Sequence, residues 1–73
     1  MTLREQIDHH LILIGRGSLT DPGKREARIE LQAYFDIWEG NPYNEDRWNI
    51  TEAYIYRVAY AHGRTLLHQE VLR

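Results

Sequence analysis

The chain is 73 residues long, contains no cysteine and carries nine basic and eleven acidic side chains, for a net charge of −2. A domain of this length buries only about 60% of its unfolded surface and no disulfide bond stabilises it, so we expect a partner chain to add stability. The net negative charge gives the molecule no positive electrostatic field that would attract a polyanion, which argues against DNA binding. No apolar run reaches the roughly 18 residues of a membrane span and the layout of a secretion signal is missing, so we expect a cytoplasmic protein without membrane contact.

The first predicted element is a helix of about twelve residues that starts at Thr2. Thr2 and Glu5 have the spacing of a capping box, and Leu3, Ile7, Leu11 and Ile14 follow at helical intervals. The apolar run 10–14 is also compatible with a short buried strand. We favour the helix, because a single strand would have no other strand to pair with.

A second helix is expected from Asp21 to about Glu39, after a breaker-rich loop over 15–21. Asp21 is the expected N-cap, Pro22 fits the first helical position, and Gly40 ends the helix. This helix carries apolar residues on two sides. One stripe consists of Ala27, Leu31, Tyr34, Phe35 and Trp38, and the other of Ile29, Ala33 and Ile37.

The longest predicted helix covers 44–71, with Asn41 or Asn44 as its cap after the turn 40–44. A short link between two long helices predicts an antiparallel helical hairpin. The expected fold is therefore all-α, one domain over 1–73 with three helices, assembled as a homo-oligomer.

This long helix is also apolar on two sectors, which predicts two packing partners. The first sector contains Trp48, Ile55, Val58, Ala59, His62 and Leu66, and the second contains Ala53, Tyr56, Tyr60, Gly63, Leu67 and Val71. Because a chain this short has few elements to cover both sectors, we expect the second sector to contact another copy. The expected interface residues are Tyr56, Tyr60, Gly63 and Leu67.

The sequence contains no recognisable catalytic or metal-binding pattern, so we expect neither an enzyme nor a cofactor. Ser18 is the only serine and lacks a histidine and an acid at a known spacing. His9 and His10 point about 100° apart on a helix, and the spacing of His62 and His68 does not suit shared ligation.

Cations and glycines around the second predicted helix start suggest an anion site. Gly15 and Gly17 expose backbone amides, and a helix N-terminus adds partial positive charge. The nearby cations are Arg16, Lys24, Arg25 and Arg28. The order does not match a P-loop, and a solvated loop with a solvated first turn is an equally good interpretation.

Three segments, Gln6-Ile-Asp-His-His10, the Asn41-Pro42 turn and Tyr60-Ala-His-Gly-Arg64, together with the Arg/Ala-rich second helix, resemble a family of small phage proteins. These are helical-hairpin sponges of the anti-CBASS and anti-Thoeris type, which sequester cyclic nucleotide signals. The resemblance implies an oligomer in the host cytoplasm that binds a cyclic nucleotide or a cyclic ADP-ribose isomer without cleaving it. It also implies phosphate-binding roles for His9, His10, Arg16, Lys24, Arg25 and Arg28.

A second function is compatible with the same sequence. Exposed aromatic residues such as Tyr43 are typical of small protein-binding inhibitors or adaptors, including anti-CRISPR-like and host-takeover factors. A sponge should lose activity when Lys24 or Arg25 becomes glutamate, whereas a protein-binding inhibitor should lose it when an exposed aromatic is removed.

Overall fold

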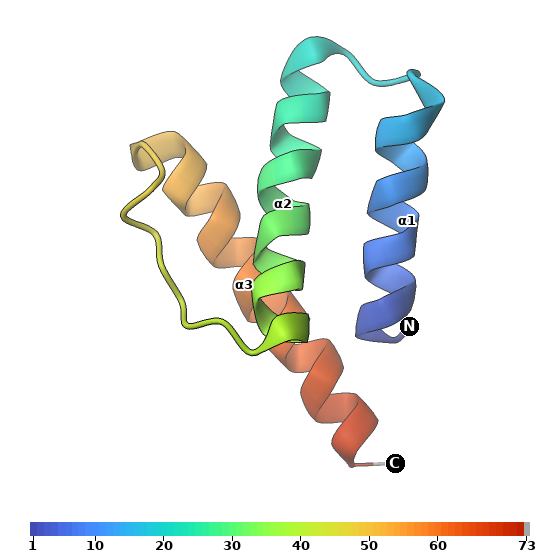
Figure 1. Ribbon diagram of the computed structural model, residues 1–73, viewed down its shortest axis with the longest axis vertical. Helices are drawn as coiled ribbons and strands as arrows, with labels where there is room; N and C mark the ends of the chain where they lie inside the picture. Colours follow the sequence, from blue (N-terminus) through green and yellow to red (C-terminus); the bar gives the residue numbers. More distant parts are fainter. Residues whose placement is uncertain (73) are drawn as a thin grey trace.

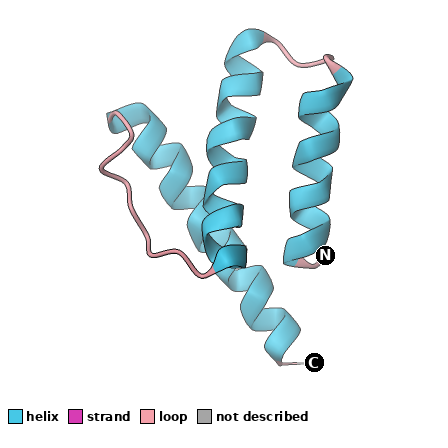
Figure 2. Cartoon of the chain, viewed as in Figure 1, coloured by secondary structure: helices cyan, strands magenta, loops and turns pink. Residues whose placement is uncertain are grey.

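The computed structural model describes residues 1–72 and contains three helices in that range, with no strand (Figures 1 and 2). Helix α1 spans Leu3–Arg16, α2 spans Asp21–Glu39 and α3 spans Ile50–Val71. Residues 10–14 lie inside α1, so the strand alternative for this run is wrong and the helical prediction is confirmed. None of the three helices is both long enough and apolar enough to cross a membrane, within residues 1–72.

The first two helices begin and end close to the predicted positions. Thr2 and Glu5 form the expected capping box, with reciprocal hydrogen bonds of 3.1 Å. The N-cap of α2 is Thr20 rather than Asp21, because its hydroxyl accepts a hydrogen bond from the amide of Gly23 at 3.3 Å. Gly40 ends α2 with φ of 77°, a left-handed conformation that favours glycine.

Helix α3 begins later than predicted. Its N-cap is Asn49, not Asn41 or Asn44, and Asn49 forms a second capping box with Glu52. The spacing of asparagine and glutamate three residues apart is visible in the sequence and is a stronger start signal than an isolated asparagine. Residues 40–49 consequently form a ten-residue link instead of a tight turn.

The prediction of an antiparallel hairpin for the last two helices is wrong in direction. The antiparallel pair is α1 and α2, whereas α3 crosses behind α2 and runs in the same general sense (Figure 1). Arg25 near the start of α2 shares a groove with Asn49 at the start of α3, and further along Ile37 approaches Gly63. The 19 residues of α2 span about 28 Å, and ten extended residues reach about 33 Å, so the link is long enough to return along α2.

Helix α2 is the central element, and each of its apolar stripes packs against another helix of the chain, although Trp38 at the end of one stripe stays half exposed. Tyr34 contacts α1 through the ring of His10, with the ring centroids 5.1 Å apart. On the opposite stripe, Ile29 lies beside Ile55 of α3, and Ile37 packs against Gly63. The two-sided character of α2 therefore comes from its position between α1 and α3, and it requires no second copy of the chain.

One face of α3 enters the core, and it draws residues from both predicted sectors. The buried positions are Tyr56, Ala59, Gly63 and Leu66. They recur at intervals of three, four and three residues, so they form a single stripe. The division into two separate sectors is wrong, because it placed neighbouring members of this stripe on different faces. The C-terminal end of α3 extends beyond α1 and α2 (Figure 1).

Gly63 is required by a close approach between helices. A Cβ atom at this position would lie 2.6 Å from Cδ1 of Ile37 and 3.0 Å from Cδ1 of Tyr34. The ring of Tyr34 is buried and has little room to shift. The sequence analysis placed Gly63 in a contact with another chain, whereas its close neighbours belong to the same chain.

We expect Gly63→Ala to destabilise the protein by about 1 kcal/mol, since an overpacking cost of 1–3 kcal/mol exceeds the gain in helix propensity of about 1 kcal/mol. Gly15→Ala is the control, because a Cβ there meets open space inside α1. It should raise stability by up to about 1 kcal/mol. Urea unfolding of both variants measures the difference, and equal stabilisation by the two substitutions would contradict the packing of Gly63.

Candidate functional site

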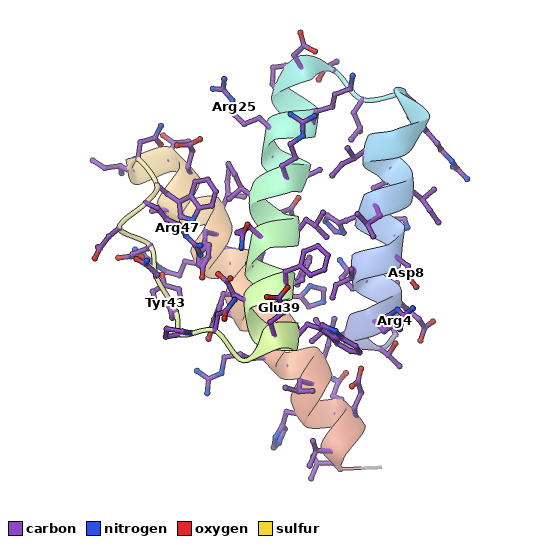
Figure 3. The ribbon with its side chains drawn as sticks, in the orientation of Figure 1. Arg4, Asp8, Arg25, Glu39, Tyr43 and Arg47 are labelled. Atoms are coloured by element: carbon purple, nitrogen blue, oxygen red, sulfur yellow. The ribbon has the colours of Figure 1, made fainter. Side chains whose placement is uncertain are left out.

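A buried carboxylate connects the link to two helices. Asp36 on α2 is 1% exposed. Its carboxylate accepts hydrogen bonds from Oη of Tyr56 at 2.6 Å and from Nε2 of Gln32 at 3.0 Å. It also accepts a hydrogen bond from Nη2 of Arg47, which belongs to the link (Figure 3). We call Asp36, Tyr56, Gln32 and Arg47 the Asp36 network.

The Asp36 network compensates for the burial of its charge. Burial alone raises the pKa of the Asp36 carboxyl, but the hydrogen bonds from Tyr56, Arg47 and Gln32 outweigh burial and hold that pKa below its usual range. The ionised form is therefore the one that fits the fold. Its contribution to stability is present above pH 3.8, the ordinary pKa, and is lost as the pH falls through the lowered value.

The same network holds the link against the helices. Oη of Tyr56 accepts hydrogen bonds from Nη2 of Arg47 at 3.2 Å and from the backbone amide of Asn44 at 3.4 Å. The guanidinium of Arg47 lies 5.2 Å from the ring centroid of Tyr56 and 5.6 Å from that of Trp48. These contacts fix the rotation of α3 about its axis, because Tyr56 can reach Asp36 only from the face that enters the core.

His10 forms a second buried polar contact between α1 and α2. Its side chain is largely buried, Nδ1 lies 3.1 Å from the carbonyl oxygen of Gln6, and Nε2 lies 3.6 Å from Oε1 of Glu30. Both neighbours accept hydrogen bonds, so the doubly protonated imidazolium satisfies the two contacts better than either neutral tautomer. The Glu30 carboxylate raises the pKa of His10, burial opposes this effect, and the Gln6 carbonyl adds to it.

The His10 contact predicts a pH-dependent stability. Because folding raises the pKa of His10 above 6.5, its stabilisation is complete below that pH and is lost as the pH rises through the folded value. We expect the free energy of unfolding to fall as the pH rises above 6.5 and through the raised pKa of His10. Urea titrations at several pH values measure this slope. His10→Gln should remove it, whereas the exposed control His68→Gln should keep it, and a slope that survives in His10→Gln would contradict the assignment.

The residues predicted to bind phosphate do not converge on one pocket. Arg16 lies in the last turn of α1, and Lys24, Arg25 and Arg28 lie in the first turns of α2, so these four cations share one end of the molecule. Within residues 1–72 none of them belongs to an ion pair. His9 is exposed, whereas both ring nitrogens of His10 are already engaged.

Arg25 is the only one of these six residues that lines the groove between the first turns of α2 and α3 (Figure 3). This groove has a volume of about 470 Å³ and an apolar floor that includes Ile29 and Ile55. Its rim carries three carboxylates and one guanidinium, from Asp21, Glu26, Glu52 and Arg25. The excess of negative charge makes this groove a poor site for a phosphate.

Two of the four predicted interface residues are internal. Tyr56 is fully buried in the Asp36 network, and Gly63 is covered by Ile37 and Tyr34 of the same chain. Their assignment to a contact between chains is wrong, since α2 occupies the space that a second copy was expected to fill. Leu67 is exposed and Tyr60 is partly buried, so for these two residues a contact with another chain stays a prediction.

The outward face of α3 carries a regular stripe that the sequence analysis missed. The stripe consists of Tyr54, Val58, Ala61, Thr65 and His68, together with Leu72, the C-cap that follows α3, all of them exposed. The intervals are four, three, four, three and four residues, so the six residues lie on one face of the helix in the register of a heptad. We call this stripe the α3 seam. The spacing could have been found in the sequence, but Val58 was grouped with residues that the structure places in the core.

The α3 seam is less polar than its composition suggests. The hydroxyl of Thr65 donates a hydrogen bond to the carbonyl oxygen of Ala61 at 3.1 Å, so its polar atom is satisfied on its own helix. The methyl groups of Ala61 and Thr65 form a shallow centre between the larger side chains of Val58 and Leu72. This profile suits knobs-into-holes packing against a second helix.

No group of three or more metal-ligating side chains is found within residues 1–72. No family model matches the chain, and neither the curated proteins nor the solved structures contain a match to it. We therefore infer the function from the chemistry of the surfaces described above.

Proposed function

We propose that this chain is a non-enzymatic protein-binding adaptor or inhibitor that docks a helix of its partner on the α3 seam. The observation that supports this most directly is an exposed heptad stripe on the longest helix. The seam covers about 27 Å of helix, and its residues face away from the core. A long, convex helix face suits helix pairing, whereas small-molecule sites are usually concave.

The large apolar side chains of the α3 seam are mostly exposed to solvent. Val58 is 52% exposed, and Tyr54 and Leu72 are more exposed still. Exposed apolar side chains that share one face of a helix are a feature of interaction sites.

We expect Val58→Glu to abolish partner binding while the protein stays folded, because the new charge would be buried only in the complex. Ile12→Glu is a matched control, since Ile12 on α1 is also 52% exposed. Wild type and both variants would serve as bait in lysate from the native host. The same specific partner should be retained by wild type and Ile12→Glu and lost by Val58→Glu. Retention by Val58→Glu, with native circular dichroism, would contradict docking on the seam.

A second candidate function is sequestration of a cyclic nucleotide or cyclic ADP-ribose isomer by a homo-oligomer. The observation that favours it is the group of cations at one end of the molecule, Arg16, Lys24, Arg25 and Arg28, none of which has an ion-pair partner within residues 1–72. Cations near the N-terminus of α2 are suited to an anion. The resemblance to phage sponge proteins supports the same proposal.

Titration calorimetry against cyclic dinucleotides, cyclic trinucleotides and cyclic ADP-ribose isomers tests the second function, with the mass measured by light scattering in the same buffer. Sub-micromolar binding by an oligomer should be lost in Lys24→Glu/Arg28→Glu without a change in mass. Arg64→Glu, on α3, is the control and should bind normally. A flat response to the whole panel would remove this candidate.

A further inference from the structure

We propose that the partner helix on the α3 seam is an amphipathic helix with acidic residues along its edges. This inference rests on the proposed function of the seam and specifies the chemistry of its partner. Three observations support this choice: the charges that flank the seam, the charges already paired within the chain, and the charges that a second copy would bring.

The edges of the seam carry cations and lack free acids. In heptad terms, one edge contains Arg57, Arg64 and Val71, and the other contains Ile55, His62 and Gln69. The only acidic residues of α3 are Glu52 and Glu70, and both are occupied elsewhere. Glu52 accepts a hydrogen bond from the amide of Asn49 in the capping box, and Glu70 accepts one from the amide of Leu3 at 2.5 Å.

Arg64 is the cation that remains available to a partner. Arg57 is paired with Glu45 of the link, at 3.1 Å between Nη2 and Oε2. Arg64 is exposed and has no ion pair with any of residues 1–72. Glu45 and Asp46 lie beside the first turn of α3, where they line a hollow with Ile50. Arg64 is therefore the one edge arginine without an ion pair among residues 1–72.

A second copy of the chain would not supply the missing carboxylate. In a parallel pair, Arg64 lies across from position 69 of the other helix, which is a glutamine. In an antiparallel pair, like edges meet, and the residues available are Arg57, Arg64 and Val71. At these edge positions neither in-register orientation provides an acid, and the second brings cations together. A partner with glutamate or aspartate along its edges satisfies Arg64 in either orientation.

The shape of the seam also indicates the apolar residues of the partner. Its centre is formed by Ala61 and Thr65, which are small, and its ends by larger side chains. A helix that packs here needs large aliphatic side chains at its centre to fill the space left by the small pair. The complementary partner is therefore a helix with leucine or isoleucine at its core positions and acidic residues on its flanks.

Three fluorescent peptides of about four heptads test this inference. They share leucine and isoleucine at the core positions and differ only at the edges, which carry glutamate, glutamine or lysine. Each is kept at trace concentration, and binding to the full chain is measured by fluorescence anisotropy. We expect the glutamate peptide to bind at least about tenfold more tightly than the lysine peptide, and added salt should reduce that difference.

Arg64→Glu should reverse the order of the peptides, whereas Arg4→Glu, on α1 away from the seam, should leave it unchanged. Equal binding of all three peptides, abolished by Val58→Glu, would overturn the acidic partner and leave the proposed function standing. Failure of all three peptides to bind would contradict both. Light scattering at the same concentrations completes the test. A wild-type dimer that becomes a monomer in Val58→Glu would show that a second copy of the chain occupies the seam.

Discussion

The fold depends on keeping the carboxylate of Asp36 ionised inside the protein. A buried charge is tolerated only when other groups replace the water that it loses. Here the replacements come from Gln32 on the same helix, Tyr56 on α3 and Arg47 on the link. These donors can meet Asp36 only if the link returns along α2 and α3 presents the Tyr56 face to the core. The Asp36 network thereby sets both the direction of α3 and the side of α3 that remains outside.

Local signals in the sequence predicted the helices better than their arrangement. The capping box of Thr2 and the stop at Gly40 are short-range features, and both were placed correctly. The direction of α3 depends on Asp36 and Arg47, which are eleven residues apart and resemble ordinary surface charges in the sequence. Nothing in their immediate surroundings shows that they meet, so a short link and an antiparallel hairpin were the simpler expectation. The capping spacing of Asn49 and Glu52 was readable and would have revealed the longer link.

The candidate surfaces also combine features that are visible in the sequence with features that only the fold shows. The cations at the start of α2 could be listed from the sequence, but only the fold shows that Arg25 faces an acidic groove and that His10 is held by Glu30. The heptad spacing of the α3 seam is a property of the sequence alone. The sequence does not show whether that face points outward. Val58 and Ala59 are neighbours in the chain, yet Val58 is exposed and Ala59 lies in the core. The rotation of α3 separates them, and that rotation is set by a tertiary contact.

The central claim is that α3 turns the seam outward in the isolated chain. The protein contains no cysteine, so single cysteines at positions 58 and 59 report the orientation without background. Their rates of reaction with a small thiol reagent should be compared in dilute protein. The structure predicts rapid labelling of Val58→Cys, because Val58 is exposed. It predicts strong protection of Ala59→Cys, because Ala59 is only 3% exposed. Equal rates at the two positions, or protection of position 58, would contradict the orientation of α3 and with it the proposed docking surface.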